Sequence, residues 1–397
     1  MGDARDSVRK VDRGGGRPGC PVRRGADGSW EVRGYAAARE VLRATETVQA
    51  GLGIETVEKM PSRIRRPVLY QDGPGHREQR RQTARFFTPR HVDAHYRELM
   101  TRVAEEQLAV LRAVGTAQLS DLSFTMAIEV VSDILGLTRS RPGLKSRLER
   151  FFPEEFGRPG LTSLHGLRWL LRQNANWLRI HLADVRPAIR AHRGREGERD
   201  DLISHLLAEG CSGAEILGEC LTYAAAGMVT TREFICVAAW HLFDDPRLLE
   251  RYRAAEEPQR LELLREILRL EPVVGRLSRR TTASMRVGGA SVGPGELITV
   301  FVDEANADPD VVGRAPCLLR PGRVLELGPG AAGLAFGDGA HRCPGAGVAV
   351  LEADVLLSRL FALEGLRMTS SPRVSFKDEI GGYEIRNLTV TAPPRRG

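Results

Sequence analysis

The sequence has no long hydrophobic run. No apolar segment reaches the length of about 20 residues that a membrane-spanning helix needs. The first two dozen residues also lack the apolar stretch of a signal peptide or membrane anchor. We therefore expect a soluble, cytoplasmic protein that does not bind a membrane.

Cysteine is scarce, and its spacing excludes a disulfide framework. The six cysteines form no Cys-x-x-Cys pair, and the chain is not a small secreted domain, so structural cross-links are not expected. Cys343 alone follows a glycine-rich turn and precedes an apolar stretch. It is the one cysteine to which we assign a chemical role.

Lysine is almost absent, since it occupies only four positions, and the formal net charge of +7 therefore comes from arginine. The arginines are spread along helical segments rather than gathered with aromatic residues, as they would be on a nucleic-acid-binding surface. We therefore predict no nucleic-acid partner. A charged face that docks an acidic redox partner fits this pattern better.

The spacing of apolar residues predicts a mainly α-helical protein with small β sheets, an α+β fold. Between residues 96 and 270, apolar side chains recur every three or four positions, as in amphipathic helices. Strand-like runs occur near the ends of the chain, at Trp30–Gly34, Val292–Val302 and Arg373–Ala392.

The chain is expected to form one folded unit preceded by a tail. Residues 1–24 include three consecutive glycines and show no apolar periodicity, which predicts a disordered tail without a core. No linker rich in proline, serine or glycine interrupts the interior of the remaining sequence. Residues 25–397 are therefore predicted to be a single domain.

The most informative segment runs from Phe336 to Gly345 and reads FGDGAHRCPG. Gly337 allows a tight backbone turn, and Gly345 allows the following helix to approach closely. Backbone N–H groups and a helix N-terminus around Cys343 would favour the thiolate, the form of cysteine that binds a metal. The complete pattern F-G-x-G-x-H-x-C-x-G resembles that of the cytochrome P450 family.

This resemblance covers roughly residues 25 to 395 and implies the cytochrome P450 fold, a triangular helical prism. Heme b would lie between the central and proximal helices, with Cys343 as the axial ligand of the iron. Phe336 would shield the thiolate. A thiolate ligand donates electron density that favours cleavage of the O–O bond on haem.

Glu266 and Arg269 lie three residues apart, on one face of a predicted helix. Judged by spacing alone, they would be an ordinary surface pair. Their position about seventy residues before the cysteine motif matches the buried E-x-x-R pair of the family, which implies a structural role near the proximal side of the haem. The third partner of this pair could be Arg320 or Arg323.

A set of cations resembles the residues that contact the haem propionates in this family. His76 and Arg80 lie four apart at the start of a helix and match the H-x-x-x-R pattern. Arg279 matches the next propionate contact, with Arg280 as the alternative, and His341 would add a donor from the cysteine loop. Charge-assisted hydrogen bonds from these groups would stabilise two buried carboxylates.

The segment Ala225–Thr231 resembles the central-helix motif A-G-x-acid-T-T of the family. The resemblance implies that Gly227 makes room for oxygen and that the Thr230 hydroxyl orients a proton-carrying water. Ala226 and Thr231 are assigned to the same catalytic set. Ordinary packing of small residues would explain part of the same pattern. The acid position of the motif holds Val229, so the usual carboxylate of the proton relay is missing.

These features together predict a haem-thiolate oxidoreductase of natural-product biosynthesis, supplied with electrons by a ferredoxin and a ferredoxin reductase. The missing acid favours a small aromatic or peptide-derived substrate, such as a cyclic dipeptide, and oxidative C–C or C–N coupling. Ordinary hydroxylation of a small apolar molecule is the alternative within the enzyme class. A haem-based sensor or a recruitment module is the non-enzyme alternative. Substrate contacts are expected from Gly51 to Leu69, near Trp169 and Trp177, at Ala226 and Val229, from Val273 to Arg276 and from Gly381 to Tyr383.

Overall fold

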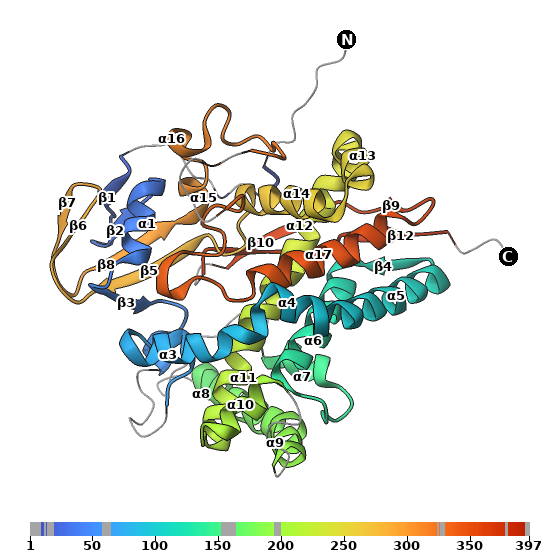
Figure 1. Ribbon diagram of the computed structural model, residues 1–397, viewed down its shortest axis with the longest axis horizontal. Coiled ribbons are helices and arrows are strands. Elements are labelled where there is room, and N and C mark those ends of the chain that lie inside the picture. Colours follow the sequence, from blue (N-terminus) through green and yellow to red (C-terminus); the bar gives the residue numbers. More distant parts are fainter. Residues whose placement is uncertain are drawn as a thin grey trace.

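The computed structural model describes residues 9–11, 13, 20–57, 65–151, 164–193, 200–323, 325, 330–377 and 380–393. Helices make up most of the molecule, and a five-stranded sheet with one covering helix lies at one side (Figure 1). The predicted architecture, mainly α with small sheets, is therefore confirmed. No helix in the described part of the chain is long and apolar enough to cross a membrane.

The largest hydrophobic core lies among long helices. Their buried faces carry mostly leucine, valine and alanine, and they pack together around the middle of the molecule. Left-handed glycines end two of them, Gly115 with φ of 84° and Gly136 with φ of 82°. The helices of this core are α5 (Arg97–Val114), α6 (Leu119–Leu135), α12 (Thr230–Asp244), α14 (Glu257–Leu270) and α17 (Ala346–Phe361).

A second core forms where α6 packs against a group of helices that lie lower in Figure 1. Two of these helices begin with a side-chain cap: Asp201 accepts from the amide of Ser204, and Ser212 and Glu215 form a reciprocal capping box. These helices are α7 (Leu144–Phe151), α8 (Leu164–Ile180), α9 (Arg186–His192), α10 (Leu202–Ala208) and α11 (Gly213–Ala224). The remaining helices are α2 (Ile54–Val57), α3 (Gly73–Thr83), α4 (Pro89–His91), α13 (Pro246–Ala254), α15 (Val302–Ala305) and α16 (Pro309–Val312).

Single helical turns of 3₁₀ or π geometry connect several of these helices. The 3₁₀ turns are Val68–Tyr70, Ala84–Phe87 and Gly339–His341, and the π turns are Val92–Tyr96, His181–Val185 and Ala225–Val229. The last of these joins α11 to α12, so the two helices form one continuous rod with a widened turn inside it.

The five-stranded sheet has the order β1-β2-β8-β5-β3. Helix α1 (Tyr35–Arg43) covers one face, where the residues that alternate along the strands form a third core. The opposite face carries polar residues such as Ser278 and Thr299. The strands are β1 (Val22–Arg24), β2 (Trp30–Val32), β3 (Thr47–Ala50), β5 (Arg276–Thr281) and β8 (Leu297–Phe301).

Three smaller sheets complete the described fold. A three-stranded sheet has the order β4-β12-β9, and two hairpins pair β6 with β7 and β10 with β11. The strands are β4 (Thr116–Gln118), β6 (Met285–Val287), β7 (Ala290–Val292), β9 (Arg367–Met368), β10 (Arg373–Lys377), β11 (Gly382–Arg386) and β12 (Thr389–Thr391).

The strand predictions are confirmed at both ends of the chain. The run Val292–Val302 contains β8 and the last residue of β7, and β7 pairs with β6. Strands β1, β5, β6 and β9 were not predicted, and neither were β3 and β4. The last two are short, and the strands that pair with them lie more than 200 residues away in the sequence.

The expectation of a disordered tail over residues 1–24 is wrong for part of that range. Val11 is only 1% exposed, and the neighbouring Arg9 and Lys10 bond to the helical body. Strand β1 belongs to the main sheet. The sequence pattern missed these contacts because they depend on partners distant in sequence. Residues 1–8, 12 and 14–19 lie outside the described residues.

Candidate haem-binding site

Cys343 lies in the loop between the turn Gly339–His341 and α17. Its amide donates to the carbonyl of Phe336 at 2.8 Å, which closes the loop over the intervening residues. Gly337 and Gly339 both have φ of 68°, a left-handed conformation that favours glycine. A Cβ at position 339 would also collide with the backbone of Leu42, so the loop packs tightly against the end of α1.

The environment of the Cys343 side chain combines solvent access with protein on all sides. The residue is exposed, and yet burial raises the pKa of its thiol. The backbone N–H of Gly345 opposes that shift, as do the charges of Arg80 and Arg342. The sulfur therefore lies beside groups that stabilise its anionic form.

Two histidines predicted to lie together are stacked in the structure. The rings of His76 on α3 and His341 in the cysteine loop lie 4.2 Å apart between centroids, with an interplanar angle of 17°. Nε2 of His341 lies 2.8 Å from Oδ1 of Asp72. Burial lowers the pKa of His76 to about 4, helped by the neighbouring charges of His341 and Arg80, so His76 is neutral at pH 7.

Asp72 is a member of this cluster that sequence reasoning missed. It precedes α3, and its Oδ2 accepts from the amide of Gln49 at 3.0 Å. Burial would raise the pKa of Asp72, but the hydrogen bonds from His341 and Gln49 hold it below its usual value. The only signal in the sequence was its position just before a Gly-Pro turn, where acidic residues are common for other reasons.

Arg279 brings a buried cation to the same cluster from β5. It is 4% exposed and donates to Oε1 of Gln49 at 2.7 Å. Burial lowers the pKa of Arg279 to about 10, with the charge of Asp72 opposing the shift. The guanidinium also donates to the carbonyl of Ser278 at 2.8 Å, so both of these acceptors are neutral oxygens. The alternative, Arg280, is exposed and donates to the carbonyl of Gly295, so the geometry favours Arg279.

Arg80 links α3 to the cysteine loop. It lies one helical turn after His76, and its guanidinium donates to the carbonyl of Arg342. The four predicted propionate contacts, His76, Arg80, Arg279 and His341, therefore come from three separate parts of the chain and converge beside Cys343.

The predicted pair on α14 is buried. Nε of Arg269 lies 2.7 Å from Oε2 of Glu266, and Nη2 lies 2.9 Å from Oε1, with 0% and 2% of the two side chains exposed. Nε of Arg323 also donates to Oε1 of Glu266, at 3.3 Å, whereas Arg320 reaches it through its backbone N–H. The question left open by the sequence is thus resolved: Arg323 supplies the third side chain.

The widened π turn Ala225–Val229 precedes Thr230. The Thr230 hydroxyl donates to the carbonyl of Ala226 at 2.6 Å, while Thr231 is buried. A Cβ on Gly227 would lie 2.8 Å from Cγ2 of Val131 on α6, so glycine at this position permits the packing of the two helices. Its role in admitting oxygen stays a prediction.

No carboxylate replaces the missing acid at Val229 from the next turn of the helix. Glu233 is fully buried and accepts from Arg232 at 2.6 Å, Arg386 at 2.9 Å and the amide of Ile385 at 2.7 Å. These bonds commit both of its oxygens to β11 and to neighbouring arginines. Glu233 therefore has a structural role.

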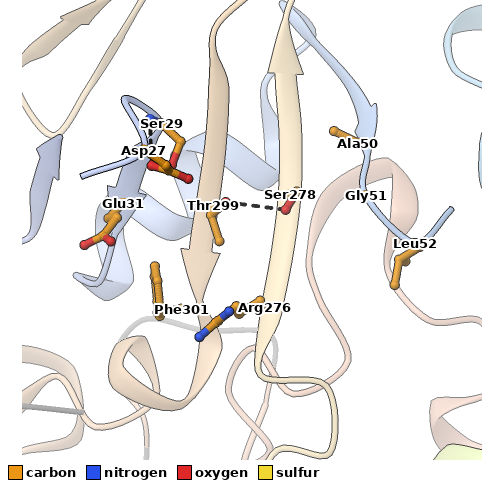
Figure 2. A pocket seen from close by; sticks show the side chains of 10 residues that line it. All are labelled: Asp27, Ser29, Glu31, Ala50, Gly51, Leu52, Arg276, Ser278, Thr299 and Phe301. Carbon is orange, nitrogen blue, oxygen red and sulfur yellow. Dashed lines mark hydrogen bonds between the residues drawn. The ribbon is translucent and has the colours of Figure 1, made fainter. Parts of the chain in front are cut away.

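Two of the segments predicted to contact substrate meet at a cavity of about 280 Å³ on the polar face of the five-stranded sheet. Figure 2 shows Gly51 and Leu52 on one side of it and Arg276 near Phe301 on the other. Residues 58–64 of the first segment lie outside the described residues.

The prediction for Tyr383 is wrong. Its side chain is 2% exposed and its hydroxyl donates to the carbonyl of Glu271 at 2.9 Å, so it belongs to the core. Trp177, in contrast, is 37% exposed and contacts the edge of Phe151.

Comparison with known proteins identifies the family. The family model for cytochrome P450 matches residues 181–380. The chain is 28% identical to erythromycin C-12 hydroxylase of Saccharopolyspora erythraea, over 87% of this chain and 84% of that protein. It is 27% identical to cyclomarin C epoxidase CymV of Salinispora arenicola, over 80% of this chain and 78% of the relative.

The fold is also that of solved structures. CYP109E1 from Bacillus megaterium, in complex with corticosterone, superposes with a TM-score of 0.77 at 22% identity, over 94% of this chain and 95% of the other. Since the family model spans half of the sequence and the structural match spans nearly all of it, the chain belongs to the cytochrome P450 family and is a monooxygenase with a cysteine-ligated haem.

Proposed function

We propose that Cys343 is the axial ligand of the haem iron and that His76, Arg80, Arg279 and His341 bind the propionates. The residues present fit this group. Arg279 is a buried guanidinium that donates to the side-chain oxygen of Gln49 and to its neighbour's carbonyl, both neutral, so a propionate would supply a carboxylate partner. The Cys343 thiol is accessible and has an N–H donor beside it, as a thiolate ligand requires.

Haem bound in this way supplies the reductive activation of O₂, and the residues of the chain have supporting roles. The carbonyl of Phe336 accepts a hydrogen bond from the Cys343 amide and helps hold the loop in place. Gly337 permits the turn of the loop, and the backbone N–H of Gly345 donates to the sulfur. Arg80 and the buried Arg279 would hold the two propionates through charge-assisted hydrogen bonds. These are the conditions for retaining a dianionic cofactor.

We propose that Thr230 is the residue that orders a proton-carrying water. Its hydroxyl already donates to the carbonyl of Ala226, which leaves the oxygen lone pairs free to accept from a water. Val229 cannot relay a proton and Glu233 is fully bonded. Proton delivery therefore depends on the Thr230 hydroxyl, on ordered water and on polar groups of the substrate.

The substrate proposal rests on Val229, an aliphatic residue at the position where the family motif has an acidic one. A substrate with its own N–H or phenolic O–H can contribute a proton that the protein does not supply. We infer a small natural product of aromatic or peptide-derived character, with a cyclic dipeptide as one example, and oxidative C–C or C–N coupling as the reaction. Coupling removes two hydrogen atoms from the substrates and adds no oxygen to the product.

Regioselective hydroxylation is the second candidate, favoured by the named activities of the relatives. Erythromycin C-12 hydroxylase and cyclomarin C epoxidase both add an oxygen atom. The mass of the product separates the two reactions, because hydroxylation adds one oxygen whereas coupling loses two hydrogens. Candidate substrates can first be selected by the shift that they produce in the haem absorption spectrum, and each bound compound is then turned over with ferredoxin and its reductase.

The electron donor and the location of the protein also remain proposals. P450 enzymes use redox partners, and we propose a ferredoxin with its reductase acting in the cytoplasm. An excess of arginine over acidic residues suits an acidic ferredoxin. Replacement of NADPH-coupled ferredoxin by chemical reductant should then lower the rate but leave the product unchanged.

A further inference from the structure

The described part of the N-terminal segment binds the helical body through both its backbone and its side chains. The amides of Lys10 and Val11 donate to the carboxylate of Glu271, which also lies 3.1 Å from Nε2 of the buried His241. Arg9 donates to the carbonyls of Leu270 and Asp303, each at 3.0 Å. We call Arg9, Lys10, Val11 and Arg13 the N-terminal clamp.

Arg13 extends this contact across two strand-bearing segments that are more than 100 residues apart. Its guanidinium donates to the carbonyls of Pro272 and Val273 in the segment after α14, and to the carbonyl of Gly381 just before β11. It also lies over the ring of Tyr383, 5.4 Å from the centroid. One planar guanidinium thus holds together two loops that are far apart in the sequence.

Two glycines near the Arg13 guanidinium leave the space that its side chain occupies. A Cβ on Gly275 would overlap Nη1 of Arg13 and would lie 2.6 Å from the carbonyl oxygen of Gly381. Gly381 has φ of 52°, and a Cβ there would lie 2.5 Å from the Arg276 side chain. Both positions therefore need glycine to let Arg13, Arg276 and the two backbones meet.

The joined segments belong to the two stretches, Val273–Arg276 and Gly381–Tyr383, in which the sequence predicts substrate contacts. Val273 to Arg276 leads into β5, which carries Arg279 to the haem site, and Arg276 lines the cavity shown in Figure 2. The amide of Arg276 donates to the carbonyl of Ile380 at 3.3 Å, a long hydrogen bond. The hydrogen bonds from the charged Arg13 guanidinium are therefore the stronger link between the two segments.

We propose that Arg13 is a positioning residue that fixes the spacing of Val273–Arg276 and Gly381 and thereby sets the selectivity for substrate size. The link to selectivity rests on the proposed function, while the link between the two segments does not. Arg13 touches neither the haem site nor the cavity. It acts through the backbone of the residues that do.

The first experiment measures hydrogen exchange in holoenzyme carrying Arg13→Ala. Amides of residues 272–276 and 380–384 should exchange about tenfold faster, because loss of hydrogen bonds from a charged group lowers the cost of local opening. Arg13→Lys retains the charge but cannot span three carbonyls, so it should show the same increase. Arg286→Ala is the matched control, since Arg286 is an exposed arginine that also donates to a carbonyl, that of Gly289.

The second experiment uses two ligands of the haem iron that differ in size, imidazole and 4-phenylimidazole. Arg13→Ala should weaken the binding of 4-phenylimidazole by about fivefold relative to imidazole. Only the larger ligand extends far enough from the iron to reach the segments expected to contact substrate. The haem content and the carbon monoxide spectrum should equal those of the parent protein.

Each outcome decides a different part of the proposal. Unchanged exchange in both Arg13 variants, or native behaviour of Arg13→Lys, would overturn the bridging role. Faster exchange with an unchanged ratio of the two ligand affinities would overturn the role in selectivity. Failure of the parent protein to bind either ligand through a haem iron would contradict the proposed function and not the clamp.

Discussion

Cys343 illustrates how much a single side chain depends on the loop that holds it. Two left-handed glycines and the hydrogen bond to Phe336 fix the loop, and the N–H of Gly345 faces the sulfur. Burial alone would keep this thiol protonated. Metal coordination is the interaction strong enough to reverse that preference.

Replacing Cys343 by serine should abolish the red-shifted carbon monoxide band of the reduced protein, because a hydroxyl cannot donate the electron density of a thiolate. The spectrum of the reduced, carbon monoxide-treated variant checks this. Cys317→Ser, at an exposed cysteine, should keep the band. A band that survives in Cys343→Ser would refute the assignment of the ligand.

Thr230 and Val229 allow a second test at the residue scale. Thr230→Ala removes the hydroxyl that we propose to order water, so reductant should be consumed with release of hydrogen peroxide in place of product. Val229→Asp buries a carboxylate without a partner and should lower stability and haem content. The measurement is peroxide released per reductant consumed.

The opposite pattern in these two variants would favour a different reading of the site. The threonine would only bond a helix carbonyl if Thr230→Ala released no more peroxide per reductant than the parent protein and Val229→Asp released less. The protein would then be a weakened ordinary hydroxylase.

The adjacent residues Arg279 and Arg280 provide a matched pair for the propionate assignment. Arg279→Ala removes a buried cation and should speed the transfer of haem to an apoprotein acceptor by about tenfold or more, the loss expected for one charge-assisted hydrogen bond. Arg280→Ala removes an exposed arginine and should leave that rate unchanged. Equal rates for both variants would argue against Arg279 as a propionate ligand.

At the scale of elements, α14 shows why equal spacing in sequence does not mean equal energy. Glu266–Arg269 and Glu78–Arg81 are both i,i+3 pairs, but the first is buried and the second has 50% and 75% of its side chains exposed. The buried pair also binds Arg323 and the carbonyl of Asn306. It ties α14 to the segment that precedes the cysteine loop.

Arg269→Ala should therefore destabilise the protein by about 3 to 5 kcal/mol, because it leaves Glu266 buried with too little compensating charge. Arg81→Ala should leave the free energy of unfolding close to that of the parent protein, because an exposed ion pair contributes little to stability. Denaturant titration of both variants, with haem content measured alongside, tests the difference. Similar losses in the two variants would show that the α14 pair contributes no more than a surface contact.

The sequence predicted the long helices and the cysteine loop well, because periodicity and glycine positions are local signals. It could not choose between Arg320 and Arg323, since both lie in an irregular segment and only the fold decides which side chain reaches Glu266. It missed β3, β4 and the N-terminal clamp for a related reason. Those elements are defined by distant partners and carry no periodic pattern of their own.

At the scale of the whole molecule, Glu219 connects parts of the fold through one buried carboxyl group. It lies on α11, and its Oε1 accepts from Gln79 of α3 at 2.6 Å and from the amide of Val68 at 2.9 Å. Its Oε2 is buried and has no hydrogen-bond partner in the described part of the chain. Burial raises the pKa of Glu219 to about 7 from an ordinary value of 4.5.

This raised pKa makes the stability of the fold depend on pH. The folded protein binds the Glu219 proton more tightly than the unfolded chain does, so the contribution is fully present below pH 4.5 and is lost as pH rises through about 7. The whole effect corresponds to about 3 kcal/mol. Glu219→Gln keeps the acceptor oxygen, stays neutral and should remove this dependence.

We therefore expect Glu219→Gln to raise the free energy of unfolding relative to the parent protein at pH 8 and to change it little at pH 5. Comparing each variant with the parent at the same pH cancels the titration of all other groups. Glu209→Gln, at an exposed position near the end of α10, should give the same difference at both pH values. A pH-independent difference for Glu219→Gln as well would mean that the folded protein holds this carboxyl ionised, because only a group that is protonated near neutrality can produce the change.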